Sequence, residues 1–227
     1  MLLLAIDTSG KQGSIALARA GEPTAEGEFE VVEIAPLVGG TFSAQLIPQI
    51  AELLSRNGFM KNAIGAFAVV SGPGSFTGLR IGLAAVKGMA EIVGKPIAAV
   101  SLLEVCVFTS GAQGRVMAAL DAGRNEVYVG EYEIPTRSER APREYILTRS
   151  EFLSQAKGWT VVTPDSVIAE AAIAAGLSVT TLAPISAAAV ARLAWRKIQS
   201  GETVSPDQLE ANYIRRTDAE MLEKSRS

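Results

Sequence analysis

The pattern of apolar and polar residues predicts strands and helices that alternate along the chain, as in a layered α/β protein. Short apolar runs at residues 2–7 and 116–121 predict buried strands, and each run ends in an acid. Longer segments with apolar residues at every third or fourth position predict helices, most clearly at 43–54 and 79–93. Further strands are expected at 14–19, 29–34, 66–70, 97–100, 126–132 and 159–163, and further helices after Ser101 and at 166–175 and 185–198.

A short repeat at half the chain length points to duplication. Residues 4–7 (Leu-Ala-Ile-Asp) and 119–121 (Ala-Leu-Asp) are each followed by a turn and a β-rich run. Chance similarity is the alternative, because strand–turn–strand segments are common. We favour duplication, with an N-terminal half over 1–108, a C-terminal half over 109–227 and a cleft between them. The segment 134–143, which is rich in proline and arginine, is expected to be an exposed linker.

The strongest local motif is the glycine-rich segment 71–78, Ser-Gly-Pro-Gly-Ser-Phe-Thr-Gly, between a predicted strand and a predicted helix. Gly72 and Gly74 permit a tight turn with open backbone N–H groups, Ser75 and Thr77 add hydroxyls, and the helix N-terminus favours an anion. The alternative is a strand-to-helix turn whose glycines serve packing alone, and the sequence does not decide between the two. The segment lacks the Gly-Lys-Ser/Thr of a Walker loop.

Asp7 and Asp121 end their strands, where α/β sheets usually bind ligands. Such acids hold Mg²⁺ through water beside a nucleotide, or they simply accept hydrogen bonds from the N–H groups of a turn. We favour the structural role slightly. If a nucleotide or anion does bind, the expected seat combines both segments and consists of Asp7, Thr8, Ser9, Gly72, Gly74, Ser75 and Thr77.

Small residues recur at helical spacing after the glycine-rich segment, at Gly78, Gly82, Ala85 and Ala90, with Gly88 beside them. Glycine inside a helix lowers helix stability by about 1 kcal/mol relative to alanine. The close approach of another helix would explain why glycines are nevertheless present at these positions. That helix could be the one predicted at residues 44–54 or one from another subunit.

Composition excludes several classes of function. The chain has no histidine, which removes Ser-His-Asp and Cys-His nucleophiles and histidine zinc sites. A net charge of −3 gives no global field for nucleic acid, and Arg137, Arg140, Arg143 and Arg149 read best as a solvated loop. The one cysteine, Cys106, lies in an apolar run and reads as a small hydrophobe. No apolar run is long enough to span a membrane, so a cytoplasmic protein is expected.

Three segments stand out together: residues 4–8, the run Ser-Gly-Pro-Gly-Ser-Phe-Thr-Gly-Leu-Arg-Ile-Gly at 71–82, and residues 119–122 with 126–128. In this order they resemble the TsaB (YeaZ) family of tRNA threonylcarbamoyladenosine biosynthesis proteins. A weaker match returns at 213–215. The chain departs from the family at Phe42-Ser43, where members often have His-Ser or His-Thr.

The resemblance implies an actin/Hsp70-like (ASKHA) α/β fold of two duplicated βββαβα-type halves. It also implies an accessory subunit that is not an enzyme. This subunit would pair with a TsaD-type catalytic subunit, joined by a TsaE-type ATPase, and would contact tRNA only through the complex. The complex would form threonylcarbamoyladenosine at adenosine 37 of tRNAs that read codons beginning with A. No cofactor is expected for this chain alone, whereas ATP or ADP with Mg²⁺ would belong to the assembly.

The partner surface is expected on the helices at about 43–56 and 78–93, and the same surface could form a homodimer. Its predicted residues are Ser43, Ile47, Ile50, Leu54, Gly78, Gly82, Ala85 and Met89. Two alternative functions remain. The first is an ATP-dependent small-molecule kinase of the same superfamily, against which stands the lack of an adenine-side glycine cluster in residues 134–227. The second is a metallopeptidase, which the absence of histidine disfavours.

Overall fold

The computed structural model of the chain describes residues 1–21, 29–135 and 142–214. The strands are β1 (Leu2–Asp7), β2 (Gly13–Ala20), β3 (Phe29–Leu37), β4 (Ile64–Gly72), β5 (Ile97–Ser101), β6 (Gly114–Gly123), β7 (Glu126–Ile134), β8 (Arg143–Thr148), β9 (Thr160–Thr163) and β10 (Ser178–Thr181). The helices are α1 (Phe42–Arg56), α2 (Phe76–Val93), α3 (Leu102–Ser110), α4 (Arg149–Gln155), α5 (Ser166–Ala174) and α6 (Ala187–Gln199), with a 3-10 turn η1 at Lys61–Ala63.

These elements form two compact units. Unit 1 contains residues 1–105 and 184–211, and unit 2 contains residues 106–183 together with the tail from residue 212. The first crossing point lies near the predicted boundary at residue 108. The predicted division differs for residues 184–211, which we assigned to the C-terminal half but which belong to unit 1, because α6 packs on the strands of the first sheet.

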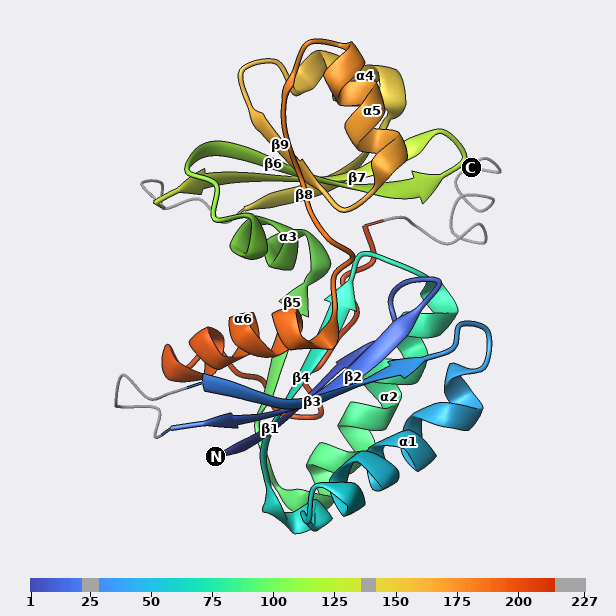
Figure 1. Cartoon of the computed structure of the whole chain (residues 1–227), viewed down its shortest axis with the longest axis vertical. Coiled ribbons are helices and arrows are strands. Elements are labelled where there is room, and N and C mark those ends of the chain that lie inside the picture. Colours follow the sequence, from blue (N-terminus) through green and yellow to red (C-terminus); the bar gives the residue numbers. More distant parts are fainter. Residues whose placement is uncertain (22–28, 136–141, 215–227) are drawn as a thin grey trace, which may run out of the picture. The chain divides into compact units, whose positions relative to one another are not determined.

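The sheet of unit 1 has the order β3-β2-β1-β4-β5. The strands β1, β2 and β3 pair in antiparallel fashion, whereas β4 and β5 run parallel to β1. Helices α1 and α2 cover one face and α6 covers the other (Figure 1). Because both faces are covered, β1 is buried along its whole length, which explains why its sequence is a continuous apolar run rather than an alternating one.

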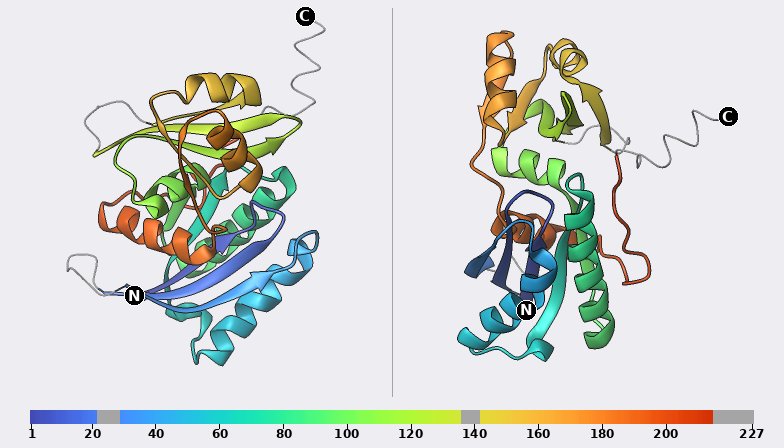
Figure 2. Two further views of the ribbon diagram at one scale, coloured as in Figure 1. Left: turned by 45° about the horizontal axis from the view of Figure 1, so that its top comes forward. Right: turned by 90° about the vertical axis from the view of Figure 1, so that its right-hand side faces the viewer.

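The sheet of unit 2 has the order β10-β9-β6-β7-β8. Its strands β6, β7 and β8 are antiparallel, and β9 and β10 run parallel to β6. Helices α4 and α5 lie over the strands of this sheet, as Figure 2 also shows. Between them and the sheet lies a core that includes Met117, Val127, Phe152, Val161 and Ile168.

The two sheets share one order and one pattern of strand directions, so β6 to β10 repeat β1 to β5. The register also repeats at the acids: Asp7 pairs with Ser14 across the first hairpin, and Asp121 pairs with Val127 across the second. The predicted duplicated α/β fold of two βββαβα-type halves is therefore confirmed.

The least accurate sequence assignments lie between residues 134 and 181. The sequence prediction missed β8, α4 and β10, and it placed Arg143 and Arg149 in a solvated loop, whereas they begin β8 and α4. Most of the expected linker, with Arg137 and Arg140, lies outside the described residues. No helix of the described chain is both long enough and apolar enough to cross a membrane.

Candidate functional site

The acid at the end of β1 is enclosed by its own turn. Asp7 is 5% exposed, and its Oδ1 accepts hydrogen bonds from the backbone N–H of Ser9 at 2.9 Å and from the Ser9 hydroxyl at 2.6 Å. Burial raises the pKa of Asp7 above its ordinary value, and the two hydrogen bonds from Ser9 oppose that shift. Asp7 is therefore a buried acid whose carboxylate oxygen holds the turn after β1 together.

Asp7 stands on the face of the sheet that α6 covers. It pairs directly with Ser14 on β2, and directly paired residues of antiparallel strands carry their side chains on the same face. The Ser14 hydroxyl in turn accepts a hydrogen bond of 2.8 Å from the backbone N–H of Ala187, the first residue of α6. The start of β2, beside the end of β1, and the start of α6 are thereby joined across 173 residues of sequence.

The glycine-rich segment packs directly on the turn after β1. The Ser75 N–H donates to the Ser9 carbonyl at 2.7 Å, and the Thr8 hydroxyl donates to the Gly78 carbonyl at 2.7 Å. A Cβ placed on Gly74 would lie 2.5 Å from the Ser9 carbonyl oxygen, and one on Gly78 would overlap the Thr8 carbonyl oxygen. These glycines allow two backbones to touch, which is the packing role that the sequence left open.

The same segment caps α2. Ser75 is the N-cap, and its hydroxyl accepts a 3.3 Å hydrogen bond from the Gly78 N–H. The predicted seat residues Asp7, Thr8, Ser9, Gly74 and Ser75 are thus brought together into one junction.

Of the other two predicted seat residues, Gly72 is buried at the end of β4, with φ of 147°, and Thr77 is exposed in the first turn of α2. The N–H groups of Ser75 and Gly78 are used inside the junction, so a nucleotide or anion seat there stays a prediction.

The predicted partner surface divides into buried and exposed residues. Ile50 and Leu54 of α1 and Gly78 and Gly82 of α2 are buried inside unit 1, and the space beside Gly82 is filled by the Thr8 hydroxyl. These four residues belong to the interior instead of the surface, because α1 and α2 pack on each other and on the sheet.

The remaining predicted partner residues are exposed or partly exposed to solvent. Ser43 and Ile47 of α1 are exposed, Ile47 to 52%, and Ala85 and Met89 of α2 are half-buried. Phe42, at the position where the family often has histidine, is 6% exposed, and its ring lies against Gly13. That side chain is therefore part of the core.

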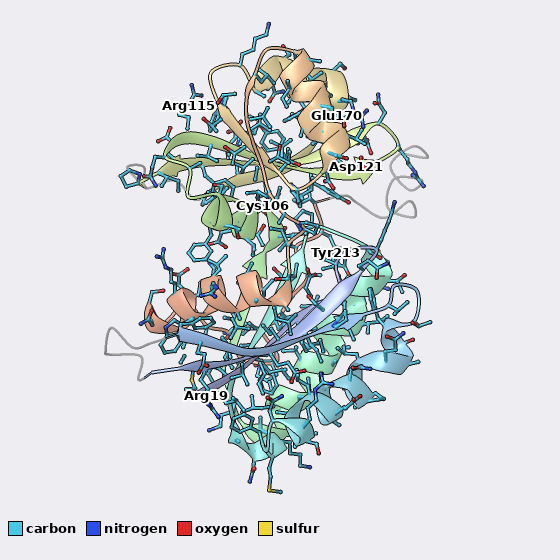
Figure 3. The ribbon with its side chains drawn as sticks, in the orientation of Figure 1. Arg19, Cys106, Arg115, Asp121, Glu170 and Tyr213 are labelled. Atoms are coloured by element: carbon cyan, nitrogen blue, oxygen red, sulfur yellow. The ribbon has the colours of Figure 1, made fainter. Side chains whose placement is uncertain are left out.

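The corresponding strand end in unit 2 is built differently. Asp165, the N-cap residue of α5, reaches across so that its Oδ2 accepts a 2.7 Å hydrogen bond from the Asp121 N–H. Asp121, labelled in Figure 3, accepts a 3.2 Å bond from the Gly123 N–H, and Thr163, which is fully buried, accepts from the Asp165 N–H at 3.0 Å. In unit 2, the strand end is therefore held by the Asp165 carboxylate, whereas in unit 1 it packs against the backbone of Gly74 and Gly78.

The sequence prediction missed Asp165 as a site residue, although its place between a strand and a helix is typical of a cap. Ser14 carried no comparable signal, since its partner lies far along the chain. Whether Asp7 and Asp121 face one cleft stays a prediction. In residues 1–21, 29–135 and 142–214, no cluster of three or more acidic or cysteine side chains is arranged to hold a metal ion.

Comparison with known proteins places the chain in a family. A family model described as TsaD, tRNA N6-adenosine threonylcarbamoyltransferase, matches residues 36–202. The tRNA threonylcarbamoyladenosine biosynthesis protein TsaB of Haemophilus influenzae is 34% identical over 134 residues, 58% of this chain and 53% of that protein. The TsaB of Escherichia coli is 35% identical over 136 residues, 59% of this chain and 55% of that protein. The chain spans about half the length of these curated relatives.

Two solved structures match nearly the whole chain. A Pseudomonas aeruginosa protein described as uncharacterized, with similarity to peptidase YEAZ, gives a TM-score of 0.71 at 28% identity over 94% of this chain and 99% of that one. YeaZ from Pseudomonas aeruginosa gives a TM-score of 0.68 at 28% identity over 93% and 100%. The chain therefore belongs to the TsaD family and, within it, to the TsaB (YeaZ) group, and it shares its fold with the YeaZ structures.

Proposed function

We propose that this chain is a non-catalytic partner subunit in the formation of N6-threonylcarbamoyladenosine at adenosine 37 of tRNAs that read codons beginning with A. It would stabilise and position a TsaD-type catalytic subunit, with a TsaE-type ATPase joining the assembly and tRNA bound through the complex. The names of its relatives and its membership of the TsaB group support this assignment.

The observation that carries the non-catalytic role is the closed junction at the end of β1. An actin-like enzyme that uses Mg²⁺ and a nucleotide needs an ionised, accessible acid at a strand end. Asp7 is buried, its pKa is raised by that burial, and its turn is filled by the glycine-rich segment. The sequence has no histidine to supply a metal site of another kind. ATP or ADP and Mg²⁺ are therefore assigned to the assembled complex.

The outer faces of α1 and α2 are the proposed contact surface, through Ser43, Ile47, Ala85 and Met89. Gly88 adds support, because it lies on the exposed side of α2 and, its own helix backbone and chain neighbours apart, no atom of the described residues lies within 4 Å of a Cβ placed there. Glycine destabilises a helix, and no packing contact within the described chain explains the glycine at this position. The close approach of a helix from another subunit would explain it. Without the catalytic subunit, the same faces would support a homodimer.

Capture of the catalytic subunit tests this surface. We expect Ile47→Glu to weaken binding of a TsaD-type subunit at least about tenfold, because the contact would bury an unpaired charge. The matched control is Ile173→Glu on α5, since Ile173 is 60% exposed and Ile47 is 52% exposed. The surface would be refuted if both folded variants bound the catalytic subunit equally well.

Reconstitution tests the role. Threonylcarbamoyl transfer to tRNA should require the catalytic subunit and should be absent with this chain alone, whatever nucleotide is supplied. Robust transfer by the purified chain would overturn the proposal. Tight, Mg²⁺-dependent binding of ATP to the isolated chain, measured by calorimetry, would instead favour the kinase alternative.

A further inference from the structure

The chain passes between its two units three times within the described residues, at 105/106, 183/184 and 211/212. The first crossing lies inside the continuous helix α3. The second is held on one side by the backbone bond from Leu182 N–H to the Thr163 carbonyl, and on the other by the bond from Ala187 N–H to Ser14. Regular helix and backbone bonds therefore flank these two crossings.

The third crossing is firmly attached to unit 1. Val204 and Ile97 exchange two backbone hydrogen bonds of 2.8 and 3.1 Å, which add a bridge to the edge of the first sheet. A tight turn follows, in which the Ser205 carbonyl accepts from the N–H groups of Gln208 and Leu209 at 3.2 and 3.1 Å. Leu209 is 3% exposed. The chain is thus anchored up to residue 209.

The attachment to unit 2 is made by a side chain. Asn212 Nδ2 donates a 2.6 Å hydrogen bond to Glu144 Oε2 on β8, and the other carboxylate oxygen of Glu144 accepts a 2.7 Å bond from the Tyr132 hydroxyl on β7. Asn212 itself is exposed, and it precedes Tyr213, which is labelled in Figure 3. Glu144 thereby ties the tail to two neighbouring strands.

Only three residue steps separate Leu209 from Asn212, so the chain between these anchors extends at most about 11 Å. A connection with so little slack restricts hinge motion between two bodies for as long as both of its ends hold. We propose that residues 205–212 form a strap that restrains the relative motion of the two units, and that the Asn212–Glu144 hydrogen bond is its releasable catch. This inference does not depend on the proposed function.

Distance measurements between the units test the strap. The native cysteine, Cys106, is fully buried, so spin labels can be placed on Ser55→Cys in α1 and Glu170→Cys in α5, both at exposed positions. Double electron–electron resonance then compares the otherwise unchanged chain with Asn212→Ala. Hydrogen exchange at residues 209–212 is measured in parallel.

We expect Asn212→Ala to broaden the distance distribution and to accelerate exchange at residues 209–212 about tenfold, because one anchor is lost. Asn212→Lys, which can still donate to Glu144, should behave like the unchanged chain. Gln113→Ala, which removes another exposed side-chain hydrogen bond, should do the same. An unchanged distribution in Asn212→Ala would overturn the strap. So would exchange that rises equally throughout unit 2, since that result indicates general destabilisation.

Discussion

The glycines of α2 offer a direct test of how the junction in unit 1 is built. Replacing Gly78 by alanine would press a methyl group onto the Thr8 carbonyl oxygen, and replacing Gly82 would press one onto the Thr8 hydroxyl. Gly88→Ala places the same methyl group on the same helix, where no atom of the described residues beyond the neighbouring helix backbone lies within 4 Å. The three substitutions therefore share the gain in helix propensity and differ in what the new methyl group meets.

The magnitudes follow from these contacts. Alanine in place of a helical glycine gains about 0.5–1 kcal/mol, so Gly88→Ala should stabilise the protein by that amount. Overpacking costs about 1–3 kcal/mol and sometimes more. Gly78 meets a backbone carbonyl that cannot rotate away, so Gly78→Ala should cost about 3 kcal/mol. Gly82→Ala should cost about 1–2 kcal/mol, because the Thr8 hydroxyl can move, although it then loses its bond to Gly78.

Thermal unfolding measures these effects. For a chain of this size, 1 kcal/mol shifts Tm by about 2–4 °C, so Gly78→Ala should lower Tm by roughly 6–12 °C and Gly88→Ala should raise it by roughly 1–4 °C. Adding Thr8→Ala to Gly82→Ala removes the overlapping hydroxyl, so the double variant should recover part of the loss. Equal Tm values for the three single alanine variants would refute the close contact between α2 and the turn after β1.

Two titrations give further predictions. The folded chain keeps a proton on Asp7 at pH values where the unfolded chain has released it, so the stability of wild type relative to Asp7→Asn should rise as pH falls through the raised pKa. Tm measured for both proteins between about pH 4 and 8 checks this, and a constant difference would contradict the burial of an ionisable acid. Burial, followed by the 2.5 Å hydrogen bond to Glu131, raises the pKa of Tyr145 to about 12. Ultraviolet titration should show this tyrosine ionising later than its ordinary 10.0, and Glu131→Gln should lower its pKa. The unfolded chain ionises first, so Tyr145 should reduce stability as pH rises between these values, and Tyr145→Phe should remove that contribution. An unchanged tyrosine pKa in Glu131→Gln would count against the hydrogen bond.

The sequence predicted the first sheet well, because its central strands β1, β2 and β4 are largely buried and the helices α1 and α2 are amphipathic and long. The apolar run of β1 and the spacing of Leu46, Ile50 and Leu53 in α1 left few alternatives. The edge elements of unit 2 were missed, since β8 is only partly buried, β10 has four residues and α4 has seven. Short elements at an edge are stabilised by their neighbours more than by their own pattern.

The sequence predicted which residues form the candidate site, but it did not predict the contacts that these residues make. The motif at residues 71–78 and the acid at Asp7 were both visible in the sequence, and the structure joins them. No pattern along the chain could show that Ser14 receives the N–H of Ala187, or that Gly82 faces Thr8, because both contacts join distant segments. The same reason explains why residues 184–211 were assigned to the wrong half.

The return of α6 to the first sheet has a consequence for synthesis on the ribosome. The last strand of that sheet ends at Ser101, and about 85 further residues precede Ala187, so at 5–20 residues per second the sheet waits roughly 4–17 s for the helix that covers its second face. During that interval the nascent chain presents an uncovered apolar surface, while the whole of unit 2's sheet is still being made. Unit 1, whose strands are translated first, is therefore completed only after the sheet of unit 2. A chaperone that binds nascent chains would encounter unit 1 with one face of its sheet still uncovered.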